Sequence, residues 1–167
     1  VCDAQNPLAV ERLRARKGRG EKPLAVMAAN TQSIREFVHV SAAEEKMLLS
    51  PAHPIVLLER IESEEDPTKP RFELQGIADG ISELGVMLPY TPLHALLFHA
   101  LEGEPAEEDW FEKRLCPSLL VMTSANPGGE PLVIDNDEAV LRLGQIADKF
   151  LMHNREILIR CDDSVVR

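Results

Sequence analysis

Short apolar runs alternate with stretches of helical periodicity along the whole chain. Four of these runs have the length of a buried strand and end at polar or turn-forming residues, and they cover residues 24–28, 54–58, 85–88 and 119–122. Apolar residues spaced three or four positions apart predict helices at 7–16, 31–38, 42–49, 92–101 and 136–150. Further strands are predicted at 157–160 and from residue 165. This alternation predicts one α/β domain, an open twisted sheet, largely parallel or mixed, flanked by helices.

The predicted helices carry recognisable start signals. Each is preceded by a side chain that can accept a hydrogen bond from the first turn. The candidates are Asn6, Asn30 or Thr31, Ser41 (with Glu44 completing a capping box), Thr91, and Asp135 or Asp137. Residues 59–73, between two predicted strands, are charged and contain proline. Their acidic group, Glu62, Glu64, Glu65 and Asp66, favours a solvated loop or hairpin tip over a metal site.

Composition excludes several classes of protein. The 167 residues suffice for one domain with a real core, and the formal net charge of −10 opposes binding to nucleic acid or anionic membranes. No apolar run has the length of a bilayer span. The three cysteines lie far apart and the five histidines show no ligand spacing, so we expect no zinc site in this segment.

The cysteines and the chain ends suggest where the protein works and what surrounds it. Free thiols suit a reducing compartment, which predicts a cytoplasmic protein. The sequence opens at Val1 without an initiator methionine and stops at Arg167 without a tail. We therefore expect residues 1–167 to be a single domain, truncated at both ends, from a longer multidomain protein.

One basic focus stands out in this acidic chain. Six cations lie between residues 12 and 22 against a single acid, Glu21, and they are Arg12, Arg14, Arg16, Lys17, Arg19 and Lys22. A phosphate-bearing ligand would need such a local cluster, because the surface as a whole repels anions. A solvated basic loop is the alternative interpretation, and this segment alone does not decide between them.

A second polar group follows the apolar run 119–122. Thr123, Ser124 and Asn126 come directly after it and are followed by Pro127 and two glycines. Small hydroxyl and amide side chains at the carboxyl end of a buried strand lie where open α/β sheets bind ligands, and they can donate hydrogen bonds to phosphate oxygens. The same residue types also make ordinary turns, so this reading stays open here.

Together these motifs resemble the YrdC-like family, which uses ATP to build carbamoyl- or threonylcarbamoyl-adenylates. The family's Lys-x-Arg and Ser-x-Asn motifs match Lys17-x-Arg19 and Ser124-x-Asn126. Longer stretches are similar to the YrdC-like domain of the hydrogenase maturation carbamoyltransferases of the HypF type, in the same order and over essentially the whole chain. These stretches are ARKGRGEKPLAVM, LGVMLPYTPLH, LVMTSANPGGEPL and IADKFLMHNREILIRCDDSVVR. The resemblance therefore predicts a YrdC-like fold.

The resemblance also implies an activity and partners. A neighbouring acylphosphatase-like domain would release carbamate from carbamoyl phosphate, and the YrdC-like domain would join carbamate to ATP with release of pyrophosphate. A carbamoyl-transfer domain would then pass the group to the C-terminal cysteine of HypE. A zinc-finger-like domain would complete the parent chain. No membrane is involved in this scheme. The family's glycine-rich strand precedes the position of Val1, so we expect the fragment alone to bind nucleotide weakly or to be inactive.

The resemblance assigns roles to individual residues. Lys17, Arg19, Ser124 and Asn126 are the expected catalytic set, because cations must offset the repulsion between carbamate and ATP. The further residues expected to bind ATP or phosphate are Lys22, Thr123, Arg155, Arg160 and Ser164. Asp162 and Asp163 are candidates for holding Mg²⁺, and the alternative is that they pair with Arg160 or Lys17.

Three other functions remain open at this point. A threonylcarbamoyl-adenylate synthase of the tRNA-modifying branch would use threonine and bicarbonate in place of carbamate. A non-catalytic RNA-binding module is disfavoured by the net charge and by the lack of aromatic residues beside the basic segment. A domain that only docks its neighbours would show no response to nucleotide.

Overall fold

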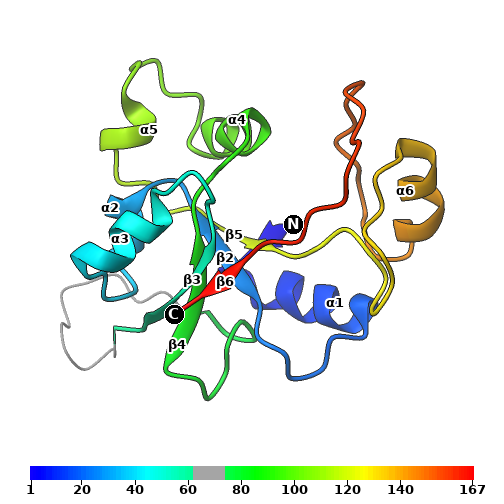
Figure 1. The fold of residues 1–167 in the computed structure, drawn as a ribbon, viewed down its shortest axis with the longest axis horizontal. Helices are drawn as coiled ribbons and strands as arrows, with labels where there is room; N and C mark the ends of the chain where they lie inside the picture. The colour runs from blue at the N-terminus through cyan, green and yellow to red at the C-terminus, as the bar shows by residue number, and fades with distance from the viewer. Residues whose placement is uncertain (62–73) are drawn as a thin grey trace.

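The computed structural model describes residues 1–61 and 74–167 of the chain. A six-stranded sheet in the order β1-β5-β2-β4-β3-β6 forms its centre (Figure 1). The strands are β1 (Cys2–Asp3), β2 (Ala25–Ala28), β3 (Ile55–Glu59), β4 (Glu83–Met87), β5 (Leu119–Met122) and β6 (Val165–Val166). The acidic group Glu62, Glu64, Glu65 and Asp66, predicted as part of a loop or hairpin tip, lies outside the described residues.

The sheet is mixed, which confirms the predicted α/β class. Strands β2 and β4 are parallel, as are β3 and β6, whereas β1–β5, β5–β2 and β4–β3 are antiparallel. Parallel pairs are thus fewer than the alternation of elements suggests. The antiparallel pairing of β5 with β2 places Met122 opposite Ala25. The carboxyl end of β5 therefore lies beside the amino end of β2, close to where the first helix ends.

Six helices accompany the strands in the described residues. They are α1 (Pro7–Lys17), α2 (Thr31–Ile34), α3 (Ala42–Leu48), α4 (Pro92–Leu101), α5 (Trp110–Lys113) and α6 (Asn136–Leu143). The predicted N-caps are confirmed: Asn6, Asn30, Ser41, Thr91 and Asp135 each accept a hydrogen bond from a backbone N–H of the following turn. Ser41 and Glu44 form the complete capping box.

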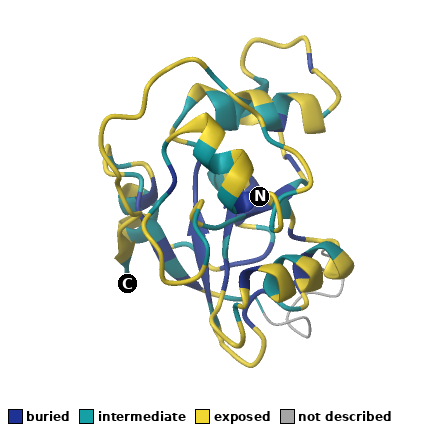
Figure 2. Cartoon of the chain, turned by 90° about the vertical axis from the view of Figure 1, so that its right-hand side faces the viewer, coloured by how far each residue is buried: buried dark blue, intermediate teal, exposed yellow. Residues whose placement is uncertain are grey.

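Both faces of the sheet are covered, because successive strand residues point to opposite sides. Val26 and Val86 join the larger core cluster, which includes residues of α1, α2 and α3. Their neighbours Met27 and Met87 join a second cluster around Phe98 of α4. Full burial of Phe98 stabilises the fold by about 2–3 kcal/mol. Figure 2 shows the buried strands between helices whose outer faces are exposed.

The helical spacing within 92–101 predicts Leu93, Leu96, Leu97, Ala100 and Leu101 as the core side chains of α4, and the structure corrects this prediction. Leu96 and Leu101 are more than half exposed. Phe98 is the fully buried residue of this helix. All sides of α4 are apolar, so periodicity could not select the buried face.

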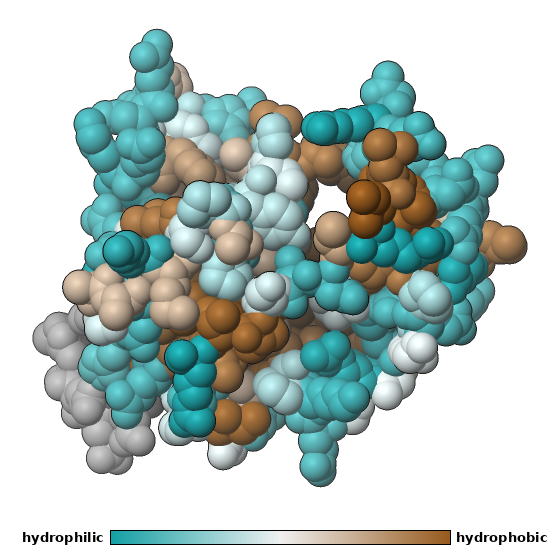
Figure 3. All heavy atoms as spheres, in the orientation of Figure 1, coloured by the Kyte–Doolittle hydropathy of each residue, from teal (hydrophilic) through white to brown (hydrophobic). Residues whose placement is uncertain are grey.

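The structure corrects two expectations near the carboxyl end and one near residue 31. The helix expected to reach residue 150 ends at Leu143, whose carbonyl accepts from both Ile146 N and Ala147 N in a tight turn. The helix expected over 31–38 stops at Ile34. Residues 157–160 form no strand in the described chain, and Leu158 is 78% exposed. Apolar atoms reach the surface in this region, on the upper right of Figure 3.

No helix among residues 1–61 and 74–167 is long and apolar enough to cross a bilayer.

Candidate functional site

The end of α1 meets the loop that follows β5. The Lys17 ammonium donates to the Ser124 carbonyl oxygen at 2.6 Å and lies 3.4 Å from Asn126 Oδ1. Gly18, with a left-handed φ of 58°, ends the helix at this point, so Lys17 occupies its last turn. Figure 1 shows the loop after β5 reaching the carboxyl end of α1. The structure thus brings together two motifs that are separated by more than a hundred residues in the chain.

Ser124 and Asn126 form a connected polar group. Ser124 Oγ donates to Asn126 Oδ1 at 2.6 Å, and the Asn126 backbone N–H donates to Ser124 O at 3.0 Å. Asn126 Nδ2 donates to the carbonyl of Glu130 at 2.5 Å. The backbone also approaches closely here, since a side chain on Gly128 would lie 3.3 Å from Lys17 O. These contacts hold the loop against the end of α1.

Lys17 is a buried cation with no carboxylate partner in the described chain. Only 9% of the residue is exposed, and the two acceptors of its ammonium are neutral oxygens. Burial lowers the pKa of Lys17, and the nearby positive charge of Arg19 lowers it further. A buried positive charge that is hydrogen-bonded but not neutralised favours the approach of an anion.

Replacing Arg19 with glutamine is expected to raise the pKa of Lys17, because it removes the neighbouring like charge. The pKa should stay below the ordinary value of 10.5, because burial is the larger cause of the shift. An NMR titration of the Lys17 side chain at alkaline pH measures both values. A pKa that does not change would contradict the electrostatic coupling of the two residues.

The lowered pKa of Lys17 determines how the free energy of unfolding depends on pH at this residue. Between the lowered pKa of Lys17 and 10.5, the unfolded chain binds more protons at this residue than the folded chain. The contribution of Lys17 to the free energy of unfolding should therefore rise with pH through that window.

Arg14 organises the basic loop, and its role was missed from the sequence. Its guanidinium donates to backbone carbonyls of two chain segments. In the basic loop these are Arg19 (3.2 Å), Gly20 (2.5 Å) and Lys22 (3.0 Å), and in the segment before β4 they are Gly76 (2.5 Å) and Ile77 (3.2 Å). One signal was present in the sequence: Val10, Arg14 and Lys17 share one face of α1, so two cations continue a buried stripe.

Arg19 and Thr123 each leave a buried polar atom without a hydrogen-bond partner in the described residues. These atoms are Arg19 Nε and Thr123 Oγ1, although Arg19 also donates through Nη2 to Pro23 O at 2.8 Å. Buried polar atoms are normally hydrogen-bonded, so such exceptions are informative. Arg19 and Thr123 were both expected to bind phosphate, but His53 Nδ1 and His153 Nδ1 are likewise buried without a partner in the described part of the chain, so this feature is not confined to the candidate site.

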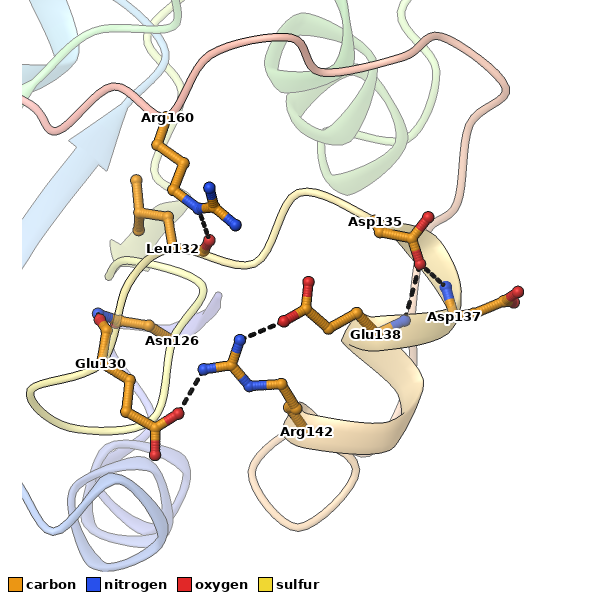
Figure 4. A network of polar contacts seen from close by, with 8 residues as sticks. All are labelled: Asn126, Glu130, Leu132, Asp135, Asp137, Glu138, Arg142 and Arg160. Atoms are coloured by element: carbon orange, nitrogen blue, oxygen red, sulfur yellow. Dashed lines mark hydrogen bonds and ion pairs between the residues drawn. The ribbon is translucent and has the colours of Figure 1, made fainter.

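The other residues expected to bind phosphate make contacts different from those of Lys17. Arg160 Nε donates to the carbonyl of Leu132 at 2.6 Å, which ties it to the loop after β5 (Figure 4). Arg155 is exposed and forms no hydrogen bond or ion pair with the described residues, and Lys22 is exposed. The backbone carbonyl of Ser164 accepts from Ile55 N at 2.8 Å, at the start of the β3–β6 ladder. Arg160 alone among these side chains is tied to the Ser124–Asn126 loop.

The candidate metal ligands lie elsewhere. Asp163 accepts a hydrogen bond from the Tyr90 hydroxyl at 3.3 Å, and Tyr90 follows the carboxyl end of β4. Because β2 and β4 are parallel, this contact lies toward the opposite ends of the strands from the Lys17 contact. Asp162 is exposed, and in the described part of the chain no group of three or more His, Cys, Asp and Glu residues could hold a metal ion. Neither aspartate pairs with Arg160 or Lys17 there.

Comparison with known proteins gives one family and a set of relatives. The family model Sua5_yciO_yrdC, described as telomere recombination, matches residues 1–167. Carbamoyltransferase HypF2 of Cupriavidus necator is 52% identical over 167 residues, and carbamoyltransferase HypF of Rhizobium leguminosarum bv. viciae is 43% identical over 168 residues. Each match covers 100% of this chain and 20% of the relative. The chain thus spans about a fifth of the length of these relatives.

Solved structures give the same grouping. Full-length HypF in its phosphate- and nucleotide-bound form superposes with a TM-score of 0.79 at 40% identity, over 98% of this chain and 22% of that one. Sua5 of P. abyssi complexed with L-threonine superposes with a TM-score of 0.61 at 20% identity, over 87% of this chain and 37% of that one. At that identity the likeness to Sua5 concerns the fold alone.

Proposed function

Because this chain belongs to the Sua5–YciO–YrdC family, we propose that it joins carbamate to the α-phosphate of ATP, forming carbamoyl-adenylate and releasing pyrophosphate. The observation that carries the proposal is the contact of Lys17 with Ser124 and Asn126. It unites a buried cation with small hydrogen-bonding groups on one loop, which is the combination that a triphosphate requires. The similarity to a HypF structure in a nucleotide-bound form supports ATP as the substrate.

The reaction is a displacement at phosphorus. A carbamate oxygen attacks the α-phosphorus, a new P–O bond forms, and the bond to the bridging oxygen between the α- and β-phosphates breaks. The electron pair of that bond leaves with pyrophosphate. Both reactants are anions, so the barrier falls only if fixed positive charge offsets their repulsion. Lys17 and Arg19 supply that charge in this proposal, and catalysis consists of positioning and electrostatic stabilisation.

The small polar residues would orient the reacting groups. Ser124 Oγ can rotate its proton from Asn126 to a phosphate or carbamate oxygen, since a hydroxyl both donates and accepts. Thr123 Oγ1 has no partner in the described residues and is a further donor. Mg²⁺ would enter bound to the ATP phosphates, as is usual for this ion. A role for Asp162 and Asp163 in holding it stays a prediction, as do those of Lys22, Arg155, Arg160 and Ser164.

The wider context follows from the relatives and is also part of the proposal. Because the similar proteins are named carbamoyltransferases HypF, we propose that the adenylate serves carbamoyl transfer in hydrogenase maturation. Carbamate would come from carbamoyl phosphate on an acylphosphatase-like domain, and HypE would receive the group. Three free cysteines agree with a cytoplasmic location.

A pyrophosphate-release assay on the intact protein tests this proposal. With ATP and carbamoyl phosphate we expect release of pyrophosphate, and with ATP, threonine and bicarbonate we expect none. Threonine-dependent release would instead identify a threonylcarbamoyl-adenylate synthase. Salt-sensitive binding of double-stranded RNA without any nucleotide binding would favour an RNA-binding module. Indifference to all of these ligands would leave only a docking role.

A further inference from the structure

Helix α6 braces the loop that follows β5 through one arginine (Figure 4). The loop is closed at its base by a hydrogen bond from Val133 N to Ala125 O at 2.8 Å. At its far side, Arg142 Nη2 binds the carboxylate of Glu130, while Nη1 of the same guanidinium binds Glu138 one turn earlier on α6. One planar group thus holds the loop and the helix at a fixed separation.

Glu130 is also the residue that orients the Asn126 side chain. Asn126 Nδ2 donates to the Glu130 carbonyl at 2.5 Å, and this leaves Oδ1 directed at Ser124 Oγ and the Lys17 ammonium. The opposite orientation of the amide would aim its NH₂ group at the ammonium, where two sets of donors would repel one another. The position of the Glu130 backbone therefore selects the orientation that Asn126 needs at the site.

The brace rests on a firm base. Asp135 caps α6 by accepting from the N–H groups of Asp137 and Glu138, and Leu143 is buried beneath the helix. The Arg142 side chain is 25% exposed, much less than that of Glu130 at 51%. The arginine is therefore the better fixed member of the pair, and Glu130 follows it.

We propose that Arg142 is a positioning residue for Asn126 and acts through Glu130. The inference rests on the proposed function in so far as it concerns nucleotide affinity, but the positioning itself is a property of the free protein. It adds a residue outside both matched motifs to the set that determines how tightly the site binds ATP.

The first test reads the Asn126 side chain directly. In the Arg142→Ala variant, the Nδ2 protons of Asn126 should exchange with solvent about three- to tenfold faster, because Glu130 loses its side-chain tie to α6 and is then anchored, among the described residues, only by the hydrogen bond from its N–H to Pro127 O. Side-chain amide NMR measures this rate without any ligand. Asp137→Asn removes a charge from the same helix without touching Arg142 and should leave the rate unchanged. An unchanged rate in Arg142→Ala would overturn the inference.

The second test is a double-mutant cycle on the binding of ATP with Mg²⁺ to the intact protein. Arg142→Ala alone should weaken binding about five- to tenfold, but it should change affinity less than about twofold when Asn126 is already alanine. Purely multiplicative effects of the two substitutions would overturn the inference, because Arg142 would then act by another route. Thermal unfolding should change little, since ion pairs that stay partly in contact with solvent contribute little to stability.

The two tests separate this inference from the proposed function. If the unaltered protein binds no ATP and releases no pyrophosphate, the proposed function is wrong, and the exchange rate of the Asn126 amide still decides the positioning role. If it binds ATP, releases pyrophosphate with carbamoyl phosphate, and the cycle is non-additive, both stand. Glu130→Gln serves as the reciprocal variant and should reproduce the effects of Arg142→Ala in both measurements.

Discussion

Replacing Lys17 with alanine is expected to lower carbamate-dependent pyrophosphate release by at least about a hundredfold in the intact protein. The loss follows from removing the buried ammonium that lies against Ser124 and Asn126, because two anions must then react without that fixed charge. The fold should survive. Asn126 Oδ1 keeps its hydrogen bond from Ser124 Oγ, and Ser124 O keeps the one from Asn126 N. The measurement is pyrophosphate release at saturating ATP, paired with a circular dichroism melt.

Lys46→Ala is the matched control, because this lysine is exposed on α3 and has no part in the site. It should release pyrophosphate at the unaltered rate. Ser124→Ala should also lose turnover, since it removes the hydroxyl that reaches the reacting oxygens. Full turnover by a folded Lys17→Ala variant would exclude Lys17 from the reaction and leave the proposed chemistry without its principal cation.

Arg14→Ala is expected to reduce the free energy of unfolding by about 2–4 kcal/mol, because one guanidinium serves five backbone carbonyls. Some of these carbonyls can turn to water, so the five bonds do not add. The Ile77 carbonyl also keeps its hydrogen bond from Leu24 N at 2.8 Å, so it is not left without a partner. Urea unfolding followed by circular dichroism gives the value. Activity should fall as well, since Arg14 fixes the loop that carries Arg19.

Arg12→Ala provides the comparison within the same helix. Its ion pair with Asp148 is exposed on both sides, so the unfolding midpoint should stay near that of the unaltered protein. The unfolding midpoint of Arg14→Lys should lie between those of Arg12→Ala and Arg14→Ala, because an ammonium keeps the charge but cannot span two sets of carbonyls. Equal midpoints for Arg12→Ala and Arg14→Ala would show that the carbonyl contacts are not what holds this region together.

The features that the sequence predicts well are local ones. The caps at Asn6, Ser41 and Thr91 depend on residues within one turn, and all three are confirmed. The apolar run 119–122 forms β5, because few other arrangements bury successive apolar residues such as Leu119, Leu120 and Val121. Strand order and direction depend on distant partners, and the excess of antiparallel pairs was not predictable from periodicity.

The predictions from the sequence are wrong where the local pattern and the tertiary contacts disagree. Residues 157–160 have strand-like composition, yet no neighbouring strand pairs with them in the described residues. Beyond Leu143 the helical spacing continues in the sequence, but the chain turns at Gly144. The partners of Arg14 could not be predicted, because they are backbone carbonyls, which carry no signature in the sequence. Only its place on the face of α1 that carries Val10 and Lys17 could be read from the spacing.

The candidate site was predictable only through its motifs. Lys17, Arg19, Ser124 and Asn126 were expected on one surface. The structure places Lys17 in contact with Ser124 and Asn126, whereas the Arg19 guanidinium donates to Pro23 O. Asp163 accepts a hydrogen bond from the Tyr90 hydroxyl, and the roles expected of Arg155 and Asp162 stay predictions. The resemblance to the YrdC-like domain of the HypF carbamoyltransferases is confirmed by relatives that match the whole chain.

The contact between Lys17 and Ser124 joins residues 107 positions apart, with β2, β3 and β4 between them in the sequence. During synthesis, α1 leaves the ribosome long before the loop after β5 exists. The Lys17 ammonium therefore stays hydrated until β5 pairs with β2. Contacts of such long range form late, because the intervening chain must first be ordered. Nucleotide affinity should accordingly be among the last properties to return when the protein is refolded. It is therefore a stringent test that refolding is complete.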